Sequence, residues 1–294
     1  MKKLAIHLAL FLATVASTFY VGIDYAGGSL RRAWLYAIPL MAILLTHELG
    51  HYFLARRHDV DASLPYFIPF PLGLGTFGAV ISMRGRIATR NALLDIGASG
   101  PIAGLVIALP VLIIGLHYSP VLPIPEHGAD EGQSLLYLAL KRIVVGPIPS
   151  GHDVFLHPTA FAGWTGLFLT MFNLIPVGQF DGGHVAYSLF GARQDRFSRF
   201  VHRGMLFVFL AVAIYATSRA YIAHARGKDL FVATFTGLNW LVWWGLIAAI
   251  GRATGASEHP PTEDSELSSG RRAVAWAMLI TFVLLFMPIP FSSH

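Results

Sequence analysis

The sequence contains no cysteine among its 294 residues. Disulfide bonds, thiol nucleophiles and thiolate metal ligands are therefore excluded, and any metal ion must be bound by histidine, aspartate or glutamate. Charged residues are also scarce, at 13% of the chain, about half of the roughly 25% that soluble domains carry. Hydrophobic residues make up 55% of the chain, so charge cannot cover a water-facing surface. These scarcities predict an integral membrane protein.

Long apolar runs locate the predicted membrane spans, because a helix needs about 20 mostly apolar residues to cross a bilayer. The runs lie near residues 4–22, 33–55, 92–117, 159–177, 204–221, 231–251 and 273–290. The first run also has the features of a secretory signal peptide, although its length favours a retained span. The predicted fold class is an all-α polytopic membrane protein with six to seven transmembrane helices, folded as one membrane-embedded domain over residues 1–294.

The net charge of +5 is explained by the membrane topology, and nucleic acid is not an expected partner. If the N-terminus is cytoplasmic, most of the 21 lysines and arginines fall in cytoplasmic loops, as the positive-inside rule requires. We therefore expect a multi-pass protein of the cytoplasmic membrane. The stretch from Leu135 to Val145 is apolar on one side and is predicted to lie on the membrane surface.

The second run contains the candidate metal site, in the sequence Thr46-His-Glu-Leu-Gly-His51. On a helix, His47 and His51 project from one face and can bind one metal ion, and Glu48 beside them can take a proton from water. Burying an acidic side chain at the centre of a span costs roughly 2.5–3.5 kcal/mol, so these residues require a metal ion or a cavity. A span starting at Ala33 places His47 about 9 Å from the cytoplasmic boundary.

A catalytic zinc site needs a third protein ligand and an open fourth position. Asp181 is the strongest candidate, in the stretch Asn173-Leu-Ile-Pro-Val-Gly-Gln-Phe-Asp-Gly-Gly183. Pro176 ends the preceding helix, and the glycines allow the tight bend that aims a carboxylate into the bundle. A capping role for Asp181 and a ligand role for His184 are the alternatives.

The third span offers weaker signals. Asp95 can tune the site, or it can be an acid that favours the start of a helix. Gly97, Gly100 and Gly104 recur at three- and four-residue spacing, which predicts close helix packing.

Together these motifs resemble the site-2 protease family of intramembrane zinc metalloproteases. The resemblance rests on the His-Glu-Leu-Gly-His motif and the later Asn-x₂-Pro-x₄-Asp-Gly turn, with further matches at residues 75–81 and 94–104. It covers about residues 33–190, which would form the catalytic core, whereas 191–294 would add accessory spans.

The resemblance implies a role for each matching residue. His47, His51 and Asp181 would bind one zinc ion, Glu48 would be the general base, and Asn173 would stabilise the oxyanion of the substrate. Residues 64–83 would form a short β segment that dips into the membrane, and its prolines and glycines are indeed incompatible with a helix. Its substrate-binding residues would be the following four: Gly75, Thr76, Phe77 and Gly78.

The function predicted from these features is that of a zinc-dependent metalloendopeptidase. It would cleave a transmembrane protein or peptide substrate within or near its membrane segment, in regulated intramembrane proteolysis, with the active site near the cytoplasmic side. A membrane metal transporter and a catalytically silent zinc-binding scaffold are the alternatives. Few ionisable residues in the other spans disfavour transport, and Glu48 disfavours a purely structural site.

Overall fold

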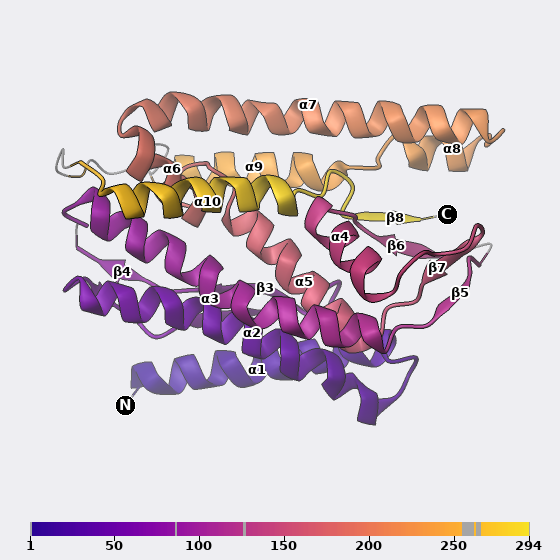
Figure 1. Cartoon of the computed structure of the whole chain (residues 1–294), viewed down its shortest axis with the longest axis horizontal. Helices are drawn as coiled ribbons and strands as arrows, with labels where there is room; N and C mark the ends of the chain where they lie inside the picture. The colour runs from indigo at the N-terminus through magenta and orange to yellow at the C-terminus, as the bar shows by residue number, and fades with distance from the viewer. Residues whose placement is uncertain (1, 86, 126–127, 255–261, 263–265, 294) are drawn as a thin grey trace.

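The computed structural model describes residues 2–85, 87–125, 128–254, 262 and 266–293 (Figure 1). Helices dominate, and within these residues four of them are long and apolar enough to cross a membrane. They are α1 (Lys2–Tyr25), α2 (Leu30–Arg57), α3 (Arg90–His117) and α7 (Arg193–Ile222). The prediction of a mostly helical membrane protein is confirmed.

The other predicted spans coincide with shorter helices. These are α5 (Pro158–Asn173), α9 (Leu238–Thr254) and α10 (Ser269–Leu285). The hydropathy runs did not give the bounds of these three helices, although the end of α5 agrees with the helix end expected at Pro176. α5 ends before Pro176, a separate helix α8 (Lys228–Ala233) and a turn at Gly237 precede α9, and α10 ends three residues before Pro288. Near these three helix ends lie Pro176, Pro288 or a glycine with positive φ, which disfavour a continuing helix, whereas Pro39, Pro101 and Pro110 are accommodated within α2 and α3.

α2 lies between α1, α3 and α5 and is central to the bundle. Small residues allow the backbones to approach closely, as van der Waals packing in membranes requires. A Cβ on Gly22 would lie 2.9 Å from the carbonyl oxygen of Ala33, and one on Gly163 would lie 2.6 Å from the backbone of Leu112. The side chains that face α1 from the middle of α2, Tyr36 and Leu40, are fully buried.

One apolar core joins the two halves of the chain. It contains Leu94 and Trp164 from α3 and α5 together with Met205, Trp240 and Leu285 from α7, α9 and α10. The accessory helices therefore share buried side chains with the helices that carry the candidate site.

The segment predicted to contain β structure forms two antiparallel strand pairs. β2 (Tyr66–Pro69) pairs with β3 (Thr76–Val80) in the register Phe67 to Ala79, and β1 (Asp61–Ala62) pairs with β4 (Met83–Arg84). α1 and α2 hold the hairpin: the hydroxyl groups of Tyr25 and Tyr36 donate hydrogen bonds to the carbonyls of Gly73 and Leu74. The β hairpin is thus packed against two helices long enough to span a bilayer.

The segment between α3 and α5 forms a cap that the sequence did not suggest. β5 (Val121–Pro123) pairs with β7 (His152–Val154), and β6 (Ala129–Glu131) pairs with the C-terminal strand β8 (Phe291–Ser293). α1 begins at one end of the molecule and β8 lies toward the other (Figure 1).

The predicted surface stretch is the amphipathic helix α4 (Leu135–Val144) within this cap. Its Lys141 is buried and donates to the carboxylates of Asp153 at 2.7 Å and Glu131 at 3.5 Å. The hydroxyl of Tyr137 also donates to Glu131. Burial, with the charge of Glu131 beside it, raises the pKa of Tyr137 above its ordinary value, so the phenol remains a hydrogen-bond donor.

Candidate metal centre

The two histidines of the predicted motif lie together on α2. His47 and His51 are one turn apart and both buried, and their Nε2 atoms are 3.1 Å from each other. Glu48 is buried as well. This part of the arrangement follows from the 3.6-residue period of a helix and needs no other element.

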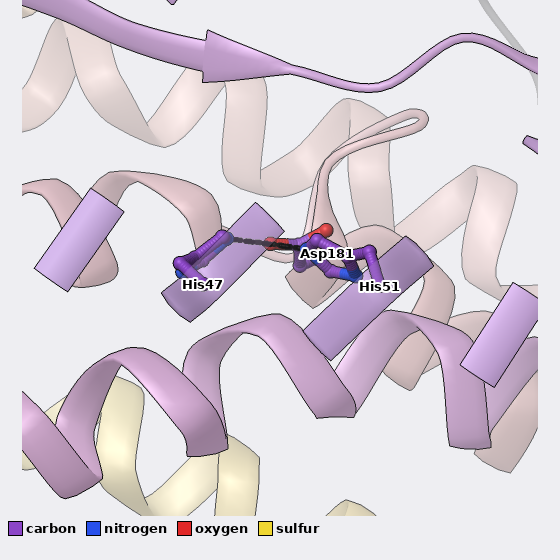
Figure 2. Close-up of side chains that lie close together, drawn as sticks. All are labelled: His47, His51 and Asp181. Atoms are coloured by element: carbon purple, nitrogen blue, oxygen red, sulfur yellow. Dashed lines mark hydrogen bonds and ion pairs between the residues drawn. The ribbon is translucent and has the colours of Figure 1, made fainter. Parts of the chain in front are cut away.

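Asp181 approaches the histidines from a distant part of the sequence. It is the first residue of α6 (Asp181–Phe190), and one of its oxygens, Oδ2, lies 3.2 Å from the Nε2 atoms of both His47 and His51. Figure 2 shows the carboxylate of Asp181 between the two imidazoles. Among the described residues, these three form the group whose arrangement can hold a metal ion.

The spacing of these donor atoms fits a small tetrahedral ion. Zinc binds nitrogen and oxygen donors at about 2.0–2.1 Å in tetrahedral sites, which places neighbouring donor atoms about 3.3 Å apart. The three separations here are 3.1, 3.2 and 3.2 Å. A nitrogen and oxygen donor set of this kind suits a divalent ion such as zinc.

The orientation of His51 is set by a backbone acceptor. Its Nδ1 lies 2.7 Å from the carbonyl oxygen of Ile96 on α3. A carbonyl can only accept, so Nδ1 carries the proton and Nε2 presents its lone pair toward Asp181 and His47. This is the arrangement by which proteins orient metal-binding histidines.

The glycines of α3 leave space for the side chains of the site, so the predicted close packing is packing of α3 against histidines of the site. A Cβ on Gly100 would overlap the imidazole of His51, and one on Gly104 would lie 3.2 Å from Nδ1 of His47. A Cβ on Gly97 would lie 2.7 Å from the Cβ of His184. α3 therefore presents a bare backbone surface to the side chains that surround the candidate metal centre.

The turn before Asp181 is tightly folded. Gly178 has a φ of 53°, in the left-handed region that favours glycine. Added Cβ atoms on Gly182 and Gly183 would overlap the carbonyls of Leu174 and Gly178. At the other end of α6, Arg90 donates to the carbonyls of Ser188 and Leu189 at 3.0 and 2.9 Å. α6 is thus held at both ends.

A cavity of about 700 Å³ opens onto the site. Glu48 and Asn173 line it together with the three metal-binding candidates, and Nδ2 of Asn173 lies 3.2 Å from Nε2 of His47. The structure therefore brings together the five residues for which the sequence predicted metal-binding or catalytic roles. His184 also lines the cavity but is outside the metal-binding group of the described residues.

The predicted substrate-binding residues lie on the same hairpin as the cavity wall but do not line it. Gly75 packs against Thr18 of α1, and the buried hydroxyl of Thr76 donates to the carbonyl of Ile68. Phe77 is 58% exposed. The wall is formed instead by the residues that follow, Ala79 to Ile81 and Met83.

Residues from the C-terminal part of the chain complete the cavity wall and had no sequence signal. They are Ser198, Arg199 and His202 of α7 and Ile247 and Ala248 of α9. None belongs to a recognisable motif, and only the packing of α7 and α9 brings them to the site.

Asp95 has a structural role apart from this cavity. Its carboxylate accepts two hydrogen bonds from Arg271 at 2.7 and 2.8 Å and lies 2.9 Å from Nε2 of His58. Asp95 therefore connects α3 to the start of α10 and to the end of α2. The expectation that it only favours the start of its own helix is incomplete.

Comparisons with known proteins show the family to which the chain belongs. The sequence model of Peptidase family M50 matches residues 35–216. The probable zinc metalloprotease EGY1 of the Arabidopsis thaliana chloroplast is 31% identical over 269 residues, which cover 86% of this chain and 43% of that protein. The corresponding chloroplast protein EGY1 of Oryza sativa subsp. japonica is 34% identical over 164 residues, covering 53% of this chain and 28% of that protein.

A further relative, the probable zinc metalloprotease EGY2 of the Arabidopsis thaliana chloroplast, is 30% identical over 160 residues. This match covers 53% of the chain and 29% of the relative. The chain thus spans less than half the length of these three curated relatives. No solved structure matches.

Proposed function

Because this chain belongs to peptidase family M50, we propose that it is an intramembrane zinc metalloprotease. The resemblance to the site-2 protease family is thereby confirmed. The observation that carries the proposal is the convergence of His47, His51 and Asp181 beside Glu48, on a cavity lined by membrane helices. The substrate would be a transmembrane protein, cleaved within or near its membrane segment. The peptidase family gives no support to a transporter or a silent scaffold.

His47, His51 and Asp181 are proposed to hold one zinc ion. Zinc in such a site supplies Lewis-acid chemistry, which lowers the pKa of water to about 7 and polarises a peptide carbonyl. The hydrogen bond from His51 to Ile96 keeps one imidazole in the binding tautomer. His47 and His51 are buried and Asp181 is partly buried, so the local dielectric constant is low and their electrostatic interactions are strengthened.

Glu48 and Asn173 are proposed to act on the substrate. The Glu48 carboxylate accepts a proton from the attacking water as the oxygen–carbon bond forms, and it transfers that proton to the amine as the carbon–nitrogen bond breaks. The Asn173 amide, next to His47, donates a hydrogen bond to the oxygen that becomes negatively charged. Atoms and charge balance without any further reactant.

The substrate is proposed to bind as an extended strand along β3 (Thr76–Val80) and the residues that flank it, Gly75 and Ile81. A transmembrane helix satisfies its own backbone hydrogen bonds and shields its peptide groups, so it must unwind locally before cleavage. β3 pairs with β2 in a two-stranded sheet, and its other edge can accept an added strand. Val80→Lys and Phe77→Lys should each raise KM with little change in kcat, and unchanged KM in both variants would contradict strand binding here.

The membrane arrangement is proposed to comprise seven spans, formed by α1, α2, α3, α5, α7, α9 and α10. An odd number agrees with α1 beginning at one end of the molecule and β8 lying toward the other (Figure 1). The β hairpin packs on α1 and α2, which supports its placement within the membrane. We propose a single domain over residues 1–294, with 33–190 as the catalytic core and 191–294 as accessory helices, in the cytoplasmic membrane with its site near the cytoplasmic side.

The test of the proposed activity is Glu48→Gln in the purified full chain. This substitution keeps the size of the side chain and removes the base, so zinc content should persist while cleavage of a model transmembrane peptide falls by about 10²–10⁴-fold. The exposed residue Glu266 offers a matched control, and Glu266→Gln should cleave like the wild type. Undiminished cleavage by Glu48→Gln would refute the proposed base.

A further inference from the structure

The turn that delivers Asp181 is attached to a helix outside the recognised motifs. The backbone N–H of Gly178 donates to the hydroxyl oxygen of Ser198, on the second turn of α7, at 3.0 Å. Gly178 precedes Asp181 by three residues. Gly183, two residues after Asp181, packs so closely on the Gly178 carbonyl that an added Cβ would overlap it. The position of Gly178 therefore determines where α6 begins.

A second contact comes from the same face of α7. Gln194, one turn before Ser198, is fully buried, and its Nε2 donates to the carbonyl of Pro176 at 3.4 Å. Ser198 is 5% exposed, whereas Arg196 and Phe197 between them are exposed. The buried face of α7 thus contacts the turn on both sides of Val177, and it does so through polar groups.

These contacts from α7 supply hydrogen-bond partners for backbone groups of the turn. Gly178 is partly buried, and a backbone N–H shielded from water needs an acceptor; the hydroxyl of Ser198 is the acceptor for Gly178. Ser198 also lies on the wall of the cavity that holds the metal-binding candidates. Removing a group that hydrogen-bonds directly to a metal ligand commonly changes metal affinity by about 10–100-fold, and because Ser198 acts through the backbone we expect the lower end of this range.

We propose that Ser198 is a positioning residue for Asp181: by holding Gly178, it sets the distance of the carboxylate from His47 and His51. The inference rests on the proposed zinc-protease function and adds to it a contribution from α7, the first helix of the accessory region. Ser198 does not touch the metal-binding atoms. It acts through the backbone between Gly178 and Asp181.

The test measures the geometry of the bound metal as well as activity. The full chain is purified in detergent, stripped with a chelator and titrated with Co²⁺, whose visible absorption bands report ligand geometry, and then with Zn²⁺ in competition. The variants are Ser198→Ala and the conservative Ser198→Thr. Ser119 offers the matched control, because its buried hydroxyl likewise accepts a backbone N–H from a distant residue, His157, at 2.9 Å.

The expected result is specific to Ser198. Ser198→Ala should shift the Co²⁺ bands, weaken Zn²⁺ binding about tenfold and lower kcat with KM unchanged. Ser198→Thr and Ser119→Ala should both match the wild type. If Ser198→Ala is not recovered folded, Gln194→Met should show the same shift of the Co²⁺ bands.

Two results would overturn the inference alone: a spectrum and affinity of Ser198→Ala identical to wild type, or an equal change in Ser119→Ala. A wild-type chain that binds neither ion would overturn the proposed function and the inference with it. Metal binding by the wild type therefore separates the two failures.

Discussion

Replacing Gly100 with alanine tests whether the bare surface of α3 is a requirement of the metal site. The ideal Cβ at this position has three atoms of the His51 imidazole as its nearest neighbours, Nε2 first, and it would overlap them. The His51 imidazole is held at Nδ1 by a hydrogen bond to the Ile96 carbonyl. The ring therefore cannot rotate away from the added Cβ without losing that hydrogen bond.

The size of the effect follows from the geometry. Non-bonded carbon atoms need about 3.5 Å of separation, so the imidazole must retreat by about 1 Å or more. Metal–ligand distances tolerate deviations of only about 0.2 Å. Gly100→Ala should therefore remove His51 from the site and weaken zinc binding by more than about 100-fold. This exceeds the loss of affinity that follows removal of a hydrogen-bond partner of a metal ligand.

The assay is zinc affinity in detergent, by competition with a chelating indicator, with circular dichroism to verify that the helices persist. Two glycines calibrate the result. Gly104→Ala, whose Cβ would lie 3.2 Å from His47, should have a smaller effect. Gly204→Ala on α7, where nothing lies within 4 Å of the added Cβ, should leave zinc affinity unchanged. Wild-type affinity in Gly100→Ala would refute the reasoning.

The remaining predictions concern the third ligand and the topology. Asp181→Ala should weaken zinc binding strongly, because it leaves the two histidines without their carboxylate partner, and full metal occupancy measured by elemental analysis would assign the ligand elsewhere. Since the chain has no cysteine, single cysteines can report the sides of the membrane. With an impermeant maleimide on intact cells, Ser292→Cys should be labelled and Asp59→Cys should not, whereas equal labelling of both would contradict seven spans with a cytoplasmic N-terminus.

Most of the helical architecture could be predicted from the sequence, because hydropathy over some 20 residues is a local property. The ends of α5 and α10, which precede Pro176 and Pro288, could not be predicted from hydropathy alone, because the apolar stretch continues past each helix end. The cap could not be predicted either: β6 pairs with β8 across more than half of the chain, and short strands of this kind carry little pattern of their own.

The candidate site likewise has a part that could be predicted from the sequence and a part that could not. The placement of His47, Glu48 and His51 follows from the period of one helix, and the sequence identified it without reference to any other segment. A short β segment at residues 64–83 was expected from the family resemblance, but the part of it that lines the cavity was not: the wall consists of Ala79 to Ile81 and Met83. Which residues of a strand face a cavity depends on how the hairpin is docked.

The sequence by itself determined the membrane character of this protein, the exclusion of thiolate chemistry and the pair of histidines with an adjacent glutamate, because each depends on composition or on neighbours within one helical turn. Only the tertiary structure decided that Asp181 meets His51 across 130 residues and that Gly100 leaves space for the His51 imidazole. The same holds for the hydrogen bond from Gly178, in the turn before Asp181, to the Ser198 hydroxyl. These are distances between separate helices, and they are set by the packing of the whole bundle, which no local pattern encodes.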